Sequence, residues 1–77
     1  MNITVRFFGL VAEVAGSSSA ELTDIADCNS LIEKLNTDFP KLNNCQYSVA
    51  VNKIIATENI NLNDGDEVAL LPPFAGG

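Results

Sequence analysis

The fold of this chain depends on one stretch, Asp64-Gly65-Asp66-Glu67-Val68-Ala69-Leu70-Leu71-Pro72-Pro73. Asp64 and Gly65 are typical of a turn, and the segment 67–71 that follows is apolar on both of its faces. A strand of this composition is best accommodated in the centre of a sheet, where both faces are covered. The two prolines cannot donate hydrogen bonds to a neighbouring strand, so the strand must end at Leu71.

The six residues after that strand are predicted to form an arm: Pro72, Pro73, Phe74, Ala75, Gly76 and Gly77. Fully extended, the arm spans roughly 20 Å, and its diproline root favours stiff polyproline geometry. Gly76 and Gly77 have no Cβ, so they can enter a narrow channel and leave the terminal carboxylate sterically accessible. We therefore expect a domain over residues 1–71 and a flexible tail over residues 72–77 that can thread a narrow channel.

The first part of the chain alternates as strands do. Residues 2–8 alternate apolar and polar side chains, which predicts a half-buried strand. Residues 10–16 read as a short excursion that ends in a turn at Gly16. A weaker alternation over residues 20–25 predicts a second strand, paired with the first in a hairpin.

Residues 28–39 carry the pattern of an amphipathic helix, with apolar residues recurring at the spacing of one helical face. Asp27 is a good N-cap, and Pro40 ends the helix because the residue before a proline is pushed out of the α region. Residues 41–46 are expected to form a polar loop. The apolar face consists of Cys28, Leu31, Ile32, Leu35 and Phe39.

The chain then returns to strand patterns. Alternation over residues 47–51 predicts a third strand, and residues 54–57 supply a short fourth one. Asn52 and Lys53 fit a tight turn between them, because asparagine tolerates positive φ. Residues 58–63 are too irregular to assign.

These elements predict an α+β fold in which one main helix covers one face of a mixed five-stranded sheet. Placing the first and last strands side by side and parallel in the middle of the sheet gives the β-grasp arrangement. With 77 residues, of which 47% are hydrophobic, the chain can build one modest core and no second domain.

Composition excludes several classes of function. No apolar run is long enough to cross a membrane and no basic segment precedes one, so we expect neither a span nor a signal peptide, and a cytoplasmic location. The net charge of −6 argues against nucleic-acid binding and favours partners with basic surfaces.

The two cysteines, Cys28 and Cys45, are far apart, and the chain contains no histidine. These facts exclude a zinc site of the usual ligand count, a four-cysteine iron–sulfur cluster, a Cys-His pair and a Ser-His-Asp triad. We expect two reduced thiols that pack as small hydrophobic groups, and no metal site.

The sequence of residues 64–77 resembles the end of the small subunits of molybdopterin synthase, which are ubiquitin-like sulfur carriers. Phe7-Phe8-Gly9, followed by Val11-Ala12-Glu13 and Ala15-Gly16, resembles the first strand of that family and the turn after it. The likeness brackets nearly the whole chain, although the middle matches in pattern more than in letters. It implies the same β-grasp fold.

An exposed apolar patch is expected near the root of the tail. Phe8 and Leu71 fall on the opposite side of their strands from the covered residues, so both should face solvent or a partner. Either Ile54 or Ile55 must do the same, and the resemblance favours Ile55. We predict that Phe8, Ile55 and Leu71 form the partner interface.

The resemblance also implies a chemistry in which Gly77 is the reactive residue. A ubiquitin-activating-like partner would adenylate Gly77 with ATP, and a sulfur donor would displace AMP to leave a thiocarboxylate. Within a heterotetramer with the large synthase subunit, that thiocarboxylate would attack cyclic pyranopterin monophosphate. This chain would bind no cofactor and supply no catalytic side chain of its own.

Two alternatives stay open. The chain could instead be another sulfur carrier or a protein modifier on the same fold, serving thiazole synthesis, tRNA thiolation or lysine conjugation. A passive β-grasp interaction module would have a tail without covalent chemistry. Intact mass after co-expression with an adenylating partner separates the last of these, since only a carrier exchanges one oxygen for sulfur.

Overall fold

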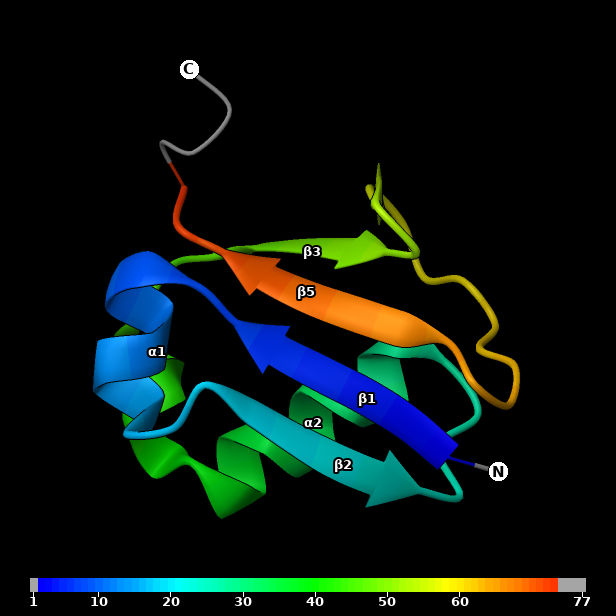
Figure 1. Ribbon diagram of the computed structural model, residues 1–77, viewed down its shortest axis with the longest axis horizontal. Helices are drawn as coiled ribbons and strands as arrows, with labels where there is room; N and C mark the ends of the chain where they lie inside the picture. The colour runs from blue at the N-terminus through cyan, green and yellow to red at the C-terminus, as the bar shows by residue number, and fades with distance from the viewer. Residues whose placement is uncertain (1, 74–77) are drawn as a thin grey trace.

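The computed structural model describes residues 2–73; Met1 and residues 74–77 lie outside the described part of the chain (Figure 1). The elements follow one another in the order β1 (Asn2–Phe7), α1 (Gly9–Ala15), β2 (Ser19–Thr23), α2 (Cys28–Asp38), the 3₁₀ helix η1 (Pro40–Asn44), β3 (Ser48–Val51), β4 (Ile54–Ile55) and β5 (Glu67–Leu71).

The five strands form one mixed sheet in the order β2-β1-β5-β3-β4. β5 lies between β1 and β3, pairing parallel with β1 and antiparallel with β3. The prediction of a central last strand parallel to the first is therefore confirmed, and with it the β-grasp arrangement. In Figure 1, α2 lies behind the sheet and α1 lies beside its left end, so the described residues leave the face toward the viewer open.

The core lies between the sheet and the helices. Val5, Val68 and Leu31 are fully buried and come from β1, β5 and α2. Phe7 meets Phe39 edge to face, with ring centroids 5.3 Å apart, which links the end of β1 to the end of α2. The alternation of β1 and the helical spacing of α2 thus bury their apolar residues in one shared layer.

The predicted helix is confirmed as α2. The carboxylate of Asp27 accepts a hydrogen bond of 2.9 Å from the backbone N–H of Ser30, as an N-cap does. Phe39, the residue before Pro40, leaves the helical conformation with φ −128° and ψ 76°.

The expectation of a single helix was incomplete, because residues 9–15 form α1 and residues 40–44 form η1. α1 is seven residues long, too short for its apolar spacing to register as a helical pattern in the sequence. Gly16 follows as its C-cap, in the left-handed conformation that is usual there, with a φ of 75°. The expected polar loop after Pro40 is a 3₁₀ turn that buries Leu42.

Four strand boundaries were also predicted too generously, and the first is that of β1, which ends at Phe7 rather than at residue 8. Asp24 has a φ of 58°, so β2 ends at Thr23 and Ile25 turns into the core from a loop. β3 begins at Ser48 rather than at residue 47. β4 stops at Ile55 rather than at residue 57.

Candidate functional site at the root of the tail

The tail leaves the domain at the end of β5, beside the end of β1 and the start of α1 (Figure 1). The N–H of Phe8 donates to the carbonyl of Leu70 at 3.1 Å, so the hydrogen bonding between β1 and β5 continues one residue past the end of β1. Pro72 is buried and Pro73 is exposed. The predicted threading residues Phe74, Ala75, Gly76 and the reactive Gly77 lie outside the described residues.

The sheet register determines which side chains share the open face. Arg6, Ala69, Ala50 and Ile55 occupy one row across β1, β5, β3 and β4. Leu71 lies two residues beyond Ala69 along β5, and so belongs to the same face. Ile55 therefore lies on the open face, whereas Ile54 pairs with the core residue Val51.

The three residues predicted for the interface lie on this face, two of them next to the tail root and the third farther away across β3. Phe8 keeps an extended backbone, with φ −119° and ψ 148°, so it continues the alternation of β1 onto the open face beside Leu71. Its side chain is 43% exposed, and that of Ile55 is 53% exposed. Phe8 and Leu71 thus flank the tail root, while Ile55 lies across β3 from them.

Ala50 and Ala69 were not singled out from the sequence. Ala50 is buried but lies outside the main core cluster, between Ala69 and Ile55 in the open-face row. In this row the two small side chains of Ala69 and Ala50 lie between the larger ones of Arg6 and Ile55. The sequence shows an alanine on the non-core side of each of these two strands, which was the available signal for this pair. Only the strand register shows that Ala50 and Ala69 lie opposite each other.

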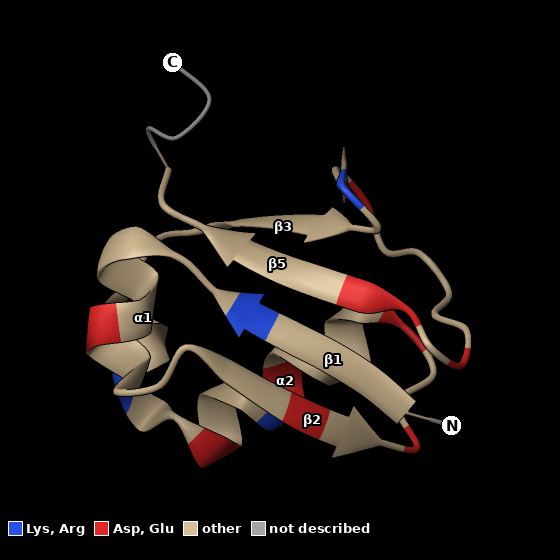
Figure 2. Ribbon diagram, in the orientation of Figure 1, with Lys and Arg blue, Asp and Glu red and all other residues tan. Residues whose placement is uncertain are grey.

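Charged residues are few in this part of the sheet, and Arg6, which pairs with Ala69 in the open-face row, is one of them. β3 and the segment Val68–Leu71 of β5 carry no charged residue, and acidic groups lie elsewhere on the ribbon (Figure 2). The nearest ion pair joins Arg6 to Glu67, with 2.6 Å between Nε and Oε2. We refer to Phe8, Ala50, Ile55, Ala69 and Leu71 as the open-face patch.

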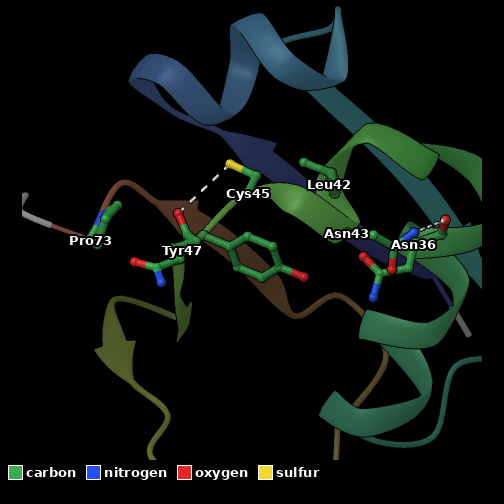
Figure 3. Close-up of a pocket in the computed structure, with 7 residues that line it drawn as sticks. Asn36, Leu42, Asn43, Cys45, Tyr47 and Pro73 are labelled. Carbon is green, nitrogen blue, oxygen red and sulfur yellow. Dashed lines mark hydrogen bonds between the residues drawn. The ribbon is translucent and has the colours of Figure 1, made fainter.

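Two pockets adjoin Pro73 on the helix side of the tail root. The first, of about 460 Å³, places Pro73 at the opposite end from Asn36 and Asn43 (Figure 3). Burial, followed by the nearby Cys45, raises the pKa of the Tyr47 phenol. The second, of about 600 Å³, is more apolar and is lined by Leu10, Glu13, Val14, Lys41, Asn44, Cys45, Gln46 and Pro73.

The two cysteines have different surroundings. Both cysteines are free thiols: Cys28 is buried in the core, and the Sγ of Cys45 donates to the carbonyl of Gln46 at 3.7 Å. Within residues 2–73, no group of three or more His, Cys, Asp or Glu side chains could hold a metal ion. None of the helices in the same part of the chain is long and apolar enough to span a membrane.

The described residues thus present a tail root that follows the central strand and lies beside the open-face patch. The model of the ThiS family matches residues 5–77. The chain belongs to the ThiS family.

Curated relatives of this ThiS-family chain align along its full length. The molybdopterin synthase sulfur carrier subunit of Mycobacterium tuberculosis is 35% identical over 82 aligned positions, covering 100% of this chain and 99% of the relative. The subunit of that name from Escherichia coli is 31% identical, covering 97% of this chain and 99% of the relative. The resemblance inferred from both ends of the sequence is therefore confirmed.

Solved structures agree with this ThiS-family fold. SAMP1, the small archaeal modifier protein 1 of Haloferax volcanii, superposes with a TM-score of 0.82 at 26% identity, covering 100% of both chains. A chain from the complex of subunits 1 and 2 of the molybdopterin-converting factor of Helicobacter pylori superposes with a TM-score of 0.75 at 26% identity, again covering 100% of both.

Proposed function

We propose that this chain is the sulfur carrier subunit of a molybdopterin synthase. The observation that carries the proposal is full-length identity of 31 to 35% to three relatives of that name. The geometry supports it, because the tail root lies at the end of the central strand and beside the open-face patch.

The proposed cycle starts at the carboxylate of Gly77. A carboxylate is a poor electrophile, so a partner enzyme joins it to AMP from ATP with release of pyrophosphate. A sulfur donor then attacks the acyl carbon, AMP leaves, and the C-terminus becomes a thiocarboxylate. Adenylation therefore supplies the leaving group that sulfur transfer requires.

The thiocarboxylate sulfur is the nucleophile of the second half. It forms a bond to a carbon of cyclic pyranopterin monophosphate as an oxygen substituent leaves that carbon, and attack of water on the resulting thioester returns the carboxylate of Gly77 and leaves the sulfur on the substrate. Two such transfers supply both sulfurs of the dithiolene. The contribution of this chain is positional: its domain docks on the large subunit, and its arm raises the effective concentration of sulfur at the substrate.

Deletion of Gly77 tests this proposal. Gly77 has no side chain that could pack, and it follows the last residue of β5 by six positions in the sequence, so the thermal stability of the shortened chain should change by no more than a few tenths of a kcal/mol. Docking on the large subunit should largely survive. Sulfur transfer should be lost, since a misplacement of about 1 Å can cost a factor near 10².

The assay combines the chain with ATP, an activating enzyme, a sulfur source and the large subunit, and measures molybdopterin. Intact mass of the parent shows whether one oxygen has been exchanged for sulfur. Conversion by the Gly77-deleted chain at the parent rate would exclude the sulfur-carrier function.

The similarity to SAMP1 favours one second candidate, a protein modifier that forms amide bonds with lysine side chains. It would share adenylation of Gly77 but end in a conjugate of higher mass. Mass spectrometry of trypsin-digested cell extract after expression of a tagged chain distinguishes the two, because a modifier leaves its fragment 54–77, which follows the last lysine of the chain, attached to target lysines, and a sulfur carrier does not.

A further inference from the structure

Two consecutive prolines at the tail root have different surroundings. Pro72 is buried, whereas Pro73 is exposed. They follow Leu71, the last residue of β5, which is itself half-buried. The described chain is therefore held by packing for one residue beyond the end of its last strand.

Pro72 packs against a glycine. A Cβ placed on Gly9 would lie 2.9 Å from the Cγ of Pro72, closer than real Cβ atoms approach another heavy atom, and 3.8 Å from its Cδ, an ordinary van der Waals distance. The absence of a side chain at Gly9 thus creates the notch that the proline ring occupies. Gly9 also has a φ of 54°, a conformation that residues with a Cβ rarely adopt.

Hydrogen bonds fix the walls of this notch. The N–H of Phe8 donates to the carbonyl of Leu70 at 3.1 Å, which ties the segment before Gly9 to the strand before Pro72. The carbonyl of Phe8 accepts from the N–H of Val11 at 3.1 Å, which ties the same segment to α1. The two residues that meet at the notch are therefore carried by elements already bonded to each other.

From this geometry we propose that Pro72 is a positioning residue, locked against Gly9, that sets the direction in which the arm leaves the sheet. The proposal rests on the sulfur-carrier function above. It assigns Pro72 to the domain side, so that residues 73–77 alone enter the partner and can reach about 17 Å when extended. A fixed root confines the reactive end to fewer directions, which raises its effective concentration at the acceptor.

The first test measures order at the root and needs no partner. Pro73→Ala introduces an amide directly after Pro72, and its ¹H–¹⁵N heteronuclear NOE reports on motion there. We expect a value close to those of β5 in Pro73→Ala and a clearly lower value in the double variant Pro72→Ala/Pro73→Ala. Equal values in the two variants would overturn the proposal.

The second test separates docking from transfer. Thiocarboxylated Pro72→Ala should bind the large subunit with a Kd within about twofold of the parent, while its single-turnover sulfur transfer slows about 10-fold or more. Pro73→Ala, the matched control, should slow transfer less, because it leaves the contact with Gly9 intact. Transfer by Pro72→Ala at the parent rate would contradict the proposal.

The two tests also distinguish this proposal from the function on which it rests. If the parent itself transfers no sulfur, the proposed function fails, while the NOE comparison still decides whether Pro72 fixes the root. Amide spectra of β1 and β5 show that each variant is folded. Pro72→Val, which keeps apolar bulk without the ring, replaces Pro72→Ala if the latter does not fold, and the same loss of order and transfer is expected from it.

Discussion

Small residues shape the surface next to the tail. Gly9 leaves room for Pro72, and Ala50 and Ala69 lie at the centre of the open-face patch. The larger residues Phe8 and Ile55 lie at its rim, where they remain exposed. Exposed apolar side chains gathered in one patch are typical of a protein interface. Individual residues of the patch should differ in how much they contribute to the free energy of binding.

Phe8→Ala tests the patch at the tail root. If the large subunit covers the Phe8 ring, removing the ring should weaken binding by about 1 to 3 kcal/mol, measured by calorimetric titration. Ile54→Ala is the matched control, because Ile54 is 73% exposed but pairs with Val51 and lies off the open face. A Phe8→Ala protein with the affinity of the parent would remove Phe8 from the interface.

Asp27→Ala tests the helix cap and its dependence on pH. Hydrogen bonds from the Ser30 backbone, the Ser30 side chain and Asn59 lower the pKa of Asp27 from its ordinary value of 3.8. A lowered pKa in the folded state stabilises the fold above pH 3.8, and the contribution is lost as the pH falls through the folded value. The variant should melt below the parent at neutral pH, and the difference should shrink below pH 3.8.

Thermal melts across this pH range give the measurement. Glu33→Ala is the control on the same helix, because the Glu33 side chain is exposed and makes no hydrogen bond among the described residues. A difference between Asp27→Ala and parent that stays constant down to low pH would show that the carboxylate charge does not contribute to the cap.

Among the elements, the hairpin of β3 and β4 depends most on its turn. Asn52 and Lys53 have φ values of 49° and 73°, the two consecutive positive values that a two-residue turn of this hand requires. Asn52 also donates to the Asp66 carboxylate and accepts from the N–H of Glu67, both at 3.0 Å. The turn is thereby attached to the start of β5, which helps to set the register of the central strand.

Lys53→Gly should stabilise this hairpin. Lysine is strained at positive φ, and Asn-Gly is the favoured pair for such a turn, so we expect a gain of about 0.5 to 1 kcal/mol. Urea unfolding at equilibrium measures it. Lys53→Ala should give no gain, because alanine keeps the Cβ that causes the strain; equal stability of the two variants would show that φ is not the cause.

For the molecule as a whole, charge and apolar surface are separated. The net charge is −6, and the acidic residues lie on the helices, β2, the start of β5 and the loops, away from β3 and the end of β5 (Figure 2). Charges at the rim of an interface mainly accelerate encounter, whereas a desolvated apolar centre slows dissociation. The two parts of the surface should therefore control different rate constants.

Stopped-flow binding to the large subunit tests that separation. Association should slow by about 10-fold or more as added salt shortens the Debye length from about 10 Å to about 3 Å, because the expected partner surface is basic. Phe8→Ala should keep this salt dependence and dissociate faster. Association that is independent of salt would contradict the expected basic surface of the partner.

The sequence by itself determined the parts of the protein that local patterns encode. Alternation in β1, helical spacing in α2 and the doubly apolar β5 placed the core and the central strand, because side-chain period follows directly from backbone geometry. The diproline fixed where β5 ends, since proline cannot continue a ladder. Both ends of the chain also resembled the small subunits of molybdopterin synthase closely enough to suggest the proposed function.

The tertiary structure decided what depends on residues far apart in the chain. α1 and η1 are too short for a pattern of their own and form where Val11 and Leu42 can be buried. Only strand register made partners of Ala50 and Ala69, and placed Ile55 rather than Ile54 on the open face. The contact of Gly9 with Pro72 joins residues at opposite ends of the sequence, and it exists because parallel pairing brings the ends of β1 and β5 together.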